Sequence, residues 1–138
     1  MPLAGYSGTP LVRKLGIKAG TTLALIGAPD GFRRELVGLP GDVAVTTRAA
    51  GSPELVVWFV TRRKDLERRV ERIGRLMTSG LWIAWPKQAS RMPTDLTENL
   101  VRDAALPHGL VDYKVCAINA TWSGLKFARR KQKQAPGL

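Results

Sequence analysis

Residues 55–60 read Leu-Val-Val-Trp-Phe-Val and lead into Thr-Arg-Arg-Lys at residues 61–64. Six consecutive apolar side chains, rich in β-branched and aromatic types, predict a strand that is buried on both faces at the centre of a sheet. Beyond it, apolar residues recur at intervals of three or four, as in an amphipathic helix: Leu66, Val70, Ile73 and Met77. A buried strand that runs into a helix in this way is typical of parallel α/β sheets.

The same alternation extends along the chain on both sides of this unit. We expect helices near residues 11–15, 32–37 and 96–104, and strands at residues 21–26, 43–47, 81–85, 111–119 and 125–129. Asp95, with Glu98 three residues later, predicts a capping box at the start of the last helix. The turn residues Trp122-Ser123-Gly124 separate the last two strands, which predicts an antiparallel hairpin.

Together these elements predict an α/β fold with a shortened, doubly wound, mostly parallel sheet and a C-terminal antiparallel hairpin. A sheet closed by such a hairpin looks like the methyltransferase variant of the Rossmann fold. It is shortened because the interval between Thr47 and Leu55 leaves no room for a further helix and strand.

The length of 138 residues predicts one domain at residues 1–129, with an N-terminal arm at 1–8 and a basic flexible tail at 130–138. The single cysteine, Cys116, excludes an internal disulfide. With no signal peptide and no apolar run long enough to span a bilayer, the sequence indicates a cytoplasmic protein without a membrane partner. The oligomeric state stays open.

The chain is strongly basic, with 22 Lys and Arg against 11 Asp and Glu, a formal net charge of +11. Nearly all of the excess lies in residues 62–75 and 126–138. Clustered positive charge favours contact with phosphates, although a solvated helix face and a basic tail explain it equally well. The candidate residues for binding a polyanion are Arg63, Lys64, Arg68, Arg72, Arg75, Arg129, Arg130, Lys131 and Lys133.

Several stretches together resemble a bacterial family known only as domain of unknown function 3052. They are Gly-Tyr-Ser-Gly-Thr-Pro-Leu at residues 5–11, Lys-Leu-Gly-Ile at 14–17, Trp-Pro-Lys at 85–87, Thr-Asp-Leu-Thr-Glu-Asn at 94–99 and Thr-Trp-Ser-Gly-Leu-Lys-Phe at 121–127. The resemblance covers nearly the whole chain. It implies no activity, because no catalytic or binding residue of that family can be carried over.

A methyltransferase-like fold would bind its ligand beyond the carboxyl ends of the strands. Methyltransferases that use S-adenosylmethionine typically carry an acid two residues before a G-x-G-x-G turn, and often a second acid at the end of the second strand. Here Leu25 takes the first acidic position, and Gly27 and Gly31 match only the outer glycines. The second strand ends in Thr47-Arg48. Neither of the two acids that would accept hydrogen bonds from the ligand is therefore present.

What the sequence leaves at this edge is a cationic site for an anionic ligand. The candidate ligand-binding residues are Gly27, Gly31, Arg62, Lys87, Ser90, Trp122 and Ser123, with Arg33 and Arg91 as further cations. The alternative is structural, since Gly31 suits a sharp turn and Trp122 suits the end of a hairpin.

No catalytic set can be named from the sequence. The one histidine, His108, lies in a Pro-His-Gly helix exit, and Cys116 lies in the middle of a predicted strand. No His and Cys cluster predicts a metal, and no cofactor is indicated. Of the four tryptophans, Trp58 and Trp82 suit the core, whereas Trp85 and Trp122 lie near strand ends where a base could stack.

The leading interpretation is therefore a non-catalytic basic domain that contacts an anionic partner, with nucleic acid the favoured class. The alternative is a protein that binds a small ligand, such as a nucleotide or an S-adenosyl compound, or a divergent methyltransferase-like enzyme. The observation that separates them is whether a cleft opens above the turn at residues 27–31. A third reading, a scaffold or homo-oligomer, makes no use of that turn.

Overall fold

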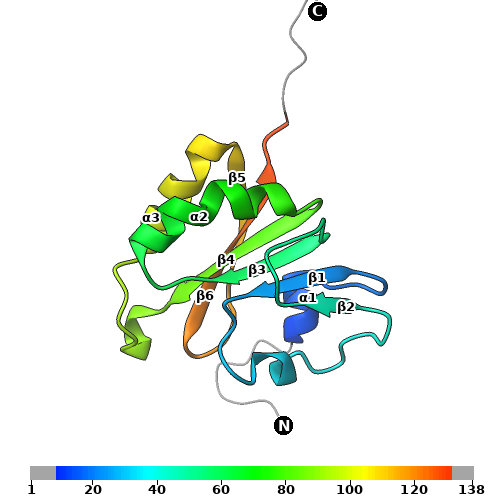
Figure 1. Cartoon of the computed structure of the whole chain (residues 1–138). Helices are drawn as coiled ribbons and strands as arrows, with labels where there is room; N and C mark the ends of the chain where they lie inside the picture. Colours follow the sequence, from blue (N-terminus) through cyan, green and yellow to red (C-terminus); the bar gives the residue numbers. More distant parts are fainter. Residues whose placement is uncertain (1–8, 132–138) are drawn as a thin grey trace, which may run out of the picture.

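The computed structural model describes residues 9–131, which form one six-stranded sheet in the order β2-β1-β3-β4-β6-β5 (Figure 1). The first four strands are parallel, and β6 runs antiparallel to both β4 and β5. The predicted fold class is confirmed, including the central position of the strand that begins at Leu55. The strands are β1 (Thr22–Ile26), β2 (Ala44–Thr46), β3 (Leu55–Phe59), β4 (Gly80–Pro86), β5 (Leu110–Ala117) and β6 (Trp122–Arg129).

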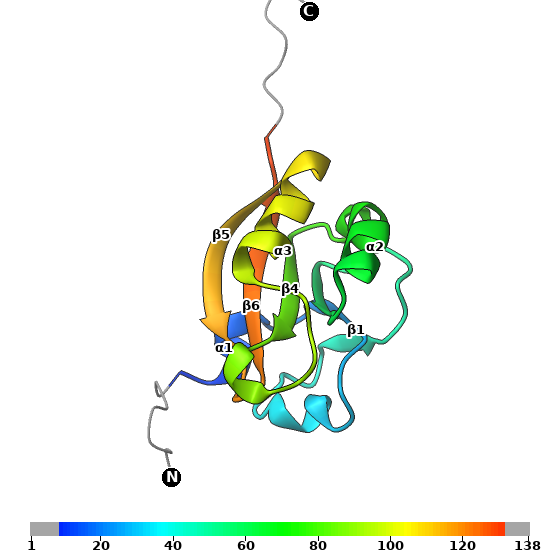
Figure 2. The ribbon, with the colours of Figure 1, turned by 90° about the vertical axis from the view of Figure 1, so that its left-hand side faces the viewer.

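The two faces of the sheet are covered unequally. Helices α2 (Arg63–Leu76) and α3 (Glu98–Ala105) cover one face, where Leu66, Val70 and Val101 join the core around Trp58. The other face is covered by the short helix α1 (Leu11–Leu15) and the single-turn 3-10 helix η1 (Phe32–Glu35). Figure 2 shows α1 and α2 on opposite sides of the sheet. Two further 3-10 turns, η2 (Gln88–Ser90) and η3 (Leu106–His108), lie in connections.

Polar contacts from the sheet satisfy the C-terminal end of α1. The indole Nε1 of the fully buried Trp82 donates to the Leu15 carbonyl at 2.9 Å, and the Lys126 ammonium lies 3.4 Å from the same oxygen. Lys114 Nζ donates to the Lys14 carbonyl at 3.0 Å. The last carbonyls of a helix have no partner within it and carry partial negative charge, so these donors hold the short helix on the sheet.

The capping box predicted from Asp95 and Glu98 is wrong. Thr97 is the N-cap of α3, and its hydroxyl accepts the Leu100 N–H at 3.2 Å. The Asp95 carboxylate instead accepts the backbone N–H of Arg63 at 2.7 Å, in the first turn of α2. Arg62, the residue before α2, offers no side-chain cap. Asp95 therefore caps a helix that begins 32 residues earlier, a contact that local spacing cannot reveal.

The turn predicted at residues 122–124 is also misplaced. These residues belong to β6 and pair with β4, Trp122 opposite Pro86 and Gly124 opposite Ala84. The reversal lies earlier, where the Asn119 carbonyl oxygen of the side chain accepts the N–H groups of Thr121 and Trp122, each at 2.9 Å. An asparagine side chain that binds the backbone two residues on favours a turn more than the Ser-Gly pair does.

The remaining boundaries differ by a few residues, and the helix expected at 32–37 is only one 3-10 turn. The predicted arm at 1–8 and the tail from residue 132 on, with Lys133, lie outside the described residues. A membrane span needs a longer and more apolar helix than any that residues 9–131 form.

Replacing Asp95 should measure this distant cap directly. Asp95→Ala removes the acceptor for the Arg63 N–H and is expected to lower the free energy of unfolding by about 1 kcal/mol. Asp95→Asn keeps an oxygen acceptor and should lose less. Urea denaturation checks this against Asp103→Ala, a change of an exposed acid on α3. Equal stability of the Asp95→Ala and Asp103→Ala proteins would contradict the assignment.

Candidate functional site

The carboxyl ends of β1 and β3 meet at Gly27. Ile26 is paired with Trp58, so the chain leaves β1 directly beside the end of β3. Gly27 has a φ of 69°, and a Cβ at this position would lie 2.8 Å from the Phe59 carbonyl oxygen. Only glycine fits both the left-handed backbone and this close approach. Gly31 also has a positive φ, 80°, but open space surrounds it, so its role is the turn into η1.

A cavity of about 300 Å³, here called the switch-point cavity, opens on the β3 side of Gly27. Its lining includes Thr61, Trp122 and, from the first turns of α2, the side chains of Asp65 and Arg69. The Arg69 guanidinium lies 6.0 Å from the centre of the Trp58 ring, and Asp65 accepts a hydrogen bond from Arg68 at 3.0 Å. The cavity therefore presents charge of both signs around an aromatic wall.

A larger cavity of about 450 Å³, here called the β1–β2 cavity, is lined by residues 28–33 of the same turn and by the end of β2. Leu25, Phe32 and Val45 contribute apolar surface to it, whereas Thr47 and Arg48 come from the segment after β2. Phe32 is buried and packs edge-to-face on Phe59, with ring centres 4.8 Å apart, which fixes η1 to the sheet. The further lining residues are Ala28, Pro29, Asp30, Gly31, Arg33 and Thr46.

The structure brings together only part of the predicted ligand-binding set. Gly27 and Trp122 line the switch-point cavity, and Gly31 lines the β1–β2 cavity with Arg33. Trp122 is 5% exposed and packs edge-to-face on Phe59 at 5.0 Å, so it forms a wall and offers little surface for stacking. Trp85 is likewise buried in the core.

The other predicted ligand-binding residues line neither cavity. They are Arg62, Lys87, Ser90 and Ser123. The Ser90 hydroxyl is used locally, because it donates to the Lys87 carbonyl at 2.6 Å and accepts the Met92 N–H at 3.3 Å. Ser123 lies within β6, paired with Trp85 and Ala117. Arg91 has a positive φ, 62°, in the turn after η2 and lines neither cavity.

Asp65 and Arg69 were not predicted as lining residues, and neither Thr61 nor Arg48 was named among the candidate ligand-binding residues. A usable signal was present for these positions. Asp65 and Arg69 are four residues apart at the start of the helix that follows the central strand, so they share the face near that strand's end. Residues just after a parallel strand lie at the binding edge of the sheet.

The predicted polyanion-binding residues on α2 are exposed, and several are paired with acids. Arg63 pairs with Glu67 at 3.0 Å, and Arg75 with Glu71 at 3.3 Å. Within the described residues, no acid lies within ion-pair distance of three exposed cations on this helix or next to its start: Arg62, Lys64 and Arg72.

Arg129 and the tail form a separate case. The Arg129 guanidinium donates to the carbonyls of Gly74 and Met77, at 2.8 and 3.1 Å, so it closes the C-terminal end of α2. Arg130 and Lys131 are exposed beyond the end of β6. Lys133 cannot be placed, because it lies outside the described residues.

The nucleophilic and basic groups of the fold lie in structural positions. Burial raises the pKa of the Cys116 thiol against the opposing effect of nearby lysines, which keeps it protonated at neutral pH. Burial, and then the neighbouring charge of Lys114, lowers the pKa of Lys126, whose ammonium lies between the rings of Trp82 and Tyr113. Within residues 9–131, no group of three His, Cys, Asp or Glu side chains could hold a metal ion.

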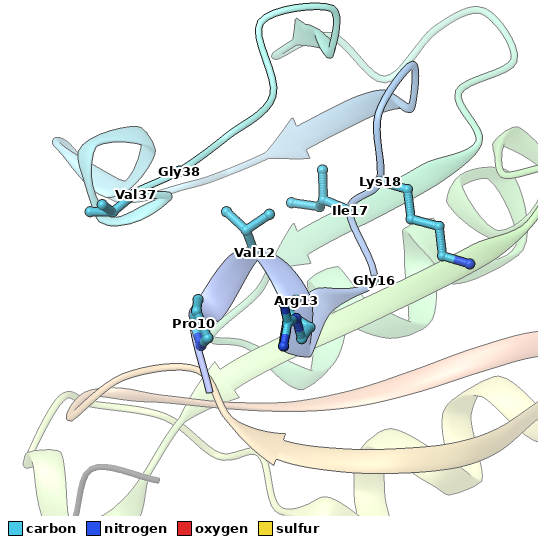
Figure 3. A pocket seen from close by; sticks show the side chains of 8 residues that line it. All are labelled: Pro10, Val12, Arg13, Gly16, Ile17, Lys18, Val37 and Gly38. Atoms are coloured by element: carbon cyan, nitrogen blue, oxygen red, sulfur yellow. The ribbon is translucent and has the colours of Figure 1, made fainter. Parts of the chain in front are cut away.

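A third cavity, of about 420 Å³, lies on the α1 side of the sheet. Figure 3 shows Val12 and Ile17 pointing toward the segment that carries Val37. Arg13 and Lys18 are the charged residues in its lining. The cavity contains none of the residues of the glycine turn, so it is separate from the site at the carboxyl edge.

Several solved structures are similar to this chain in fold. A SAM dependent methyltransferase from Aquifex aeolicus is similar over 85% of this chain and 86% of its own, with 14% identity and a TM-score of 0.65. Magnesium protoporphyrin IX methyltransferase from Synechocystis, with bound SAM, matches 88% of this chain and 74% of its own at 11% identity and a TM-score of 0.61.

A ribosomal protein L11 methylase from Lactobacillus delbrueckii matches 88% of this chain and 75% of its own, with 11% identity and a TM-score of 0.60. This chain has a methyltransferase-like Rossmann fold. At these identities the likeness extends to the fold alone. No family model and no curated protein matches the chain, so the resemblance to family 3052 stays a prediction.

The two glycines of the turn should differ in their sensitivity to substitution. Gly27→Ala places a methyl group against the Phe59 carbonyl at a positive φ and is expected to cost about 2 to 4 kcal/mol of unfolding free energy. Gly31→Ala meets open space and should cost about 1 kcal/mol. Chemical denaturation of the two variants measures the difference. Equal losses would show that the contact with Phe59 does not constrain the edge.

Proposed function

We propose that this chain binds a nucleotide-like small molecule, of the class that includes S-adenosyl compounds, at the carboxyl edge of its sheet. The observation that carries the proposal is the pair of cavities at this edge, one lined by Gly27 and the end of β3, the other by residues 28–33 and the end of β2. In open α/β sheets, ligands bind outside the carboxyl ends of the strands, where the strand order reverses. Here the order reverses between β1 and β3.

The size and lining of the β1–β2 cavity support a ligand with a flat apolar part and polar substituents. Its volume of about 450 Å³ lies in the range typical of small-molecule sites. Leu25 and Val45 supply apolar contact, and Thr46 and Thr47 place polar groups beside it. A nucleoside has this division between an apolar base and a polar sugar.

The proposal is one of binding and does not extend to methyl transfer. A hydrophobic Leu25 stands at the position where methyltransferases typically place an acid, and Arg48 follows the second strand. A ligand donor left without an acceptor in such a site costs on the order of 1 to 3 kcal/mol. The charged groups that line the switch-point cavity, Asp65 with Arg68 and Arg69 over Trp58, are arranged as an ion pair and a ring contact.

A thermal-shift experiment tests the proposed site. Adenosine 5′-monophosphate or S-adenosylhomocysteine, at concentrations far above its dissociation constant, should raise the Tm by several degrees. Thr47→Trp fills the β1–β2 cavity and should abolish the shift. Thr78→Trp, at an exposed position outside both cavities, is the control and should keep it. A Tm unchanged by either ligand, or an equal shift in both variants, would contradict the proposal.

A second candidate function is contact with a polyanion such as nucleic acid through α2. The observation in its favour is a set of exposed cations that have no acid within ion-pair distance among residues 9–131: Arg62, Lys64 and Arg72. These arginine and lysine side chains would contact phosphates, so binding would be independent of the base sequence of the nucleic acid.

Charge reversal on α2 tests this second candidate. The triple variant Arg62→Glu, Lys64→Glu and Arg72→Glu should weaken binding to RNA and reduce the slope of log K against log salt by about 2 or more. The matched control changes three exposed cations away from α2: Arg13→Glu, Lys18→Glu and Arg34→Glu. If both triple variants weakened RNA binding equally, the net charge of the protein would account for the binding, and the surface of α2 would not. Binding that is absent or insensitive to salt would reject the candidate.

A further inference from the structure

Two arginines from different loops line the β1–β2 cavity. Arg33 belongs to η1, after the glycine turn, and Arg48 follows the end of β2. Both side chains are exposed, and within residues 9–131 neither has an acid within ion-pair distance. The one carboxylate in the lining is that of Asp30. The cavity therefore carries two guanidinium groups that the protein itself does not neutralise.

Local structure fixes the backbone that carries each arginine. The Arg48 N–H donates to the Thr46 hydroxyl at 3.2 Å, which turns the chain back at the end of β2. Arg33 follows Phe32, whose buried ring is held against Phe59 at 4.8 Å. Both cations are thus carried by backbone that local contacts hold, one in η1 and the other just after β2.

The position of Arg48 determines what a bound nucleotide must carry. In dinucleotide-binding folds, an acid at the end of the second strand accepts the ribose hydroxyls, whereas an arginine in this region accommodates a phosphate on the ribose. The planar guanidinium binds phosphate oxygens through two parallel hydrogen bonds and cannot accept a hydrogen bond from a hydroxyl. Arg48 therefore favours a phosphorylated ribose over a free diol.

We infer that the β1–β2 cavity selects a nucleotide with a phosphate on its ribose ring, held between Arg33 and Arg48. The inference rests on the proposed function and names the ligand class for the same site. A free ribose diol, as in S-adenosyl compounds, would face two cations and the single carboxylate of Asp30. A 2′-phosphate instead supplies oxygens for both guanidinium groups.

Calorimetric titration with adenosine 2′,5′-bisphosphate and adenosine 5′-monophosphate tests the inference. These probes differ by the phosphate on the ribose, and the bisphosphate should bind at least about tenfold more tightly. Arg33→Ala and Arg48→Ala should each remove most of this preference while changing the affinity for the monophosphate by less than about threefold. Arg34→Ala, next to Arg33 but outside the cavity lining, is the matched control and should keep the preference.

The possible results separate the inference from the function on which it rests. If both probes bind equally well in the cavity, the selection of a ribose phosphate is overturned and the nucleotide site remains. If neither probe nor S-adenosylhomocysteine binds, the proposed function fails and the inference fails with it. A preference that persists in both Arg33→Ala and Arg48→Ala would place the phosphate elsewhere and overturn the inference.

A substitution that restores an acid gives an independent readout. Arg48→Glu offers acceptors for ribose hydroxyls, so it should reverse the order of affinity, with S-adenosylhomocysteine bound more tightly than by the unmodified chain. The bisphosphate should bind more weakly by at least about tenfold. Weaker binding of both ligands by the same factor would contradict a role for Arg48 in choosing between them.

Discussion

Every side chain of β3 and of β4 is buried, so both faces of the sheet need a cover. Helices α2 and α3 provide it on one face. On the other, a five-residue helix and one 3-10 turn suffice because buried aromatic residues fix them to the sheet. Trp82 binds the end of α1 through its indole N–H, and Phe59 packs against Phe32 of η1. η1 of this thin layer carries Arg33 at the carboxyl edge of the sheet.

The proposed ligand site lies at this same edge. The Gly27 backbone approaches the Phe59 carbonyl of β3 so closely that no side chain fits, and it lines one of the two cavities found there. In open α/β sheets ligands bind at this edge, and here Leu25 and Arg48 stand where methyltransferases typically place acids. Arg48 in place of an acid changes the chemistry from accepting hydroxyls to binding phosphate. The net charge of +11 agrees with a phosphorylated nucleotide in the β1–β2 cavity and with a polyanion on α2.

Strand and helix order could be predicted from the sequence because apolar periodicity reports burial directly, as in the run from Leu55 and the stripe of α2. The cap of α2 could not be predicted from the sequence, because the acceptor of the Arg63 N–H is Asp95, which is 32 residues away in the chain. Whether a cleft opens above the glycine turn was left open by the sequence; Gly27 and Gly31 line cavities there, whereas Arg62 and Lys87 do not. The residues that line the cavity at the end of β3 are set by the face that α2 turns toward it. Asp65 and Arg69 lie on that face, whereas Arg62 precedes the helix and does not line the cavity. The Ser90 hydroxyl donates to the Lys87 carbonyl, a local hydrogen bond that the composition of the segment does not reveal.

The central claim is that the carboxyl edge between β2 and β3 is a ligand site, and an NMR titration of the ¹⁵N-labelled chain with adenosine 2′,5′-bisphosphate tests it most directly. The account predicts that the largest amide shifts fall in two segments, residues 27–33 and residues 46–48, and saturate together. Shifts confined to the outer face of α2, or no saturable shifts at all, would contradict it.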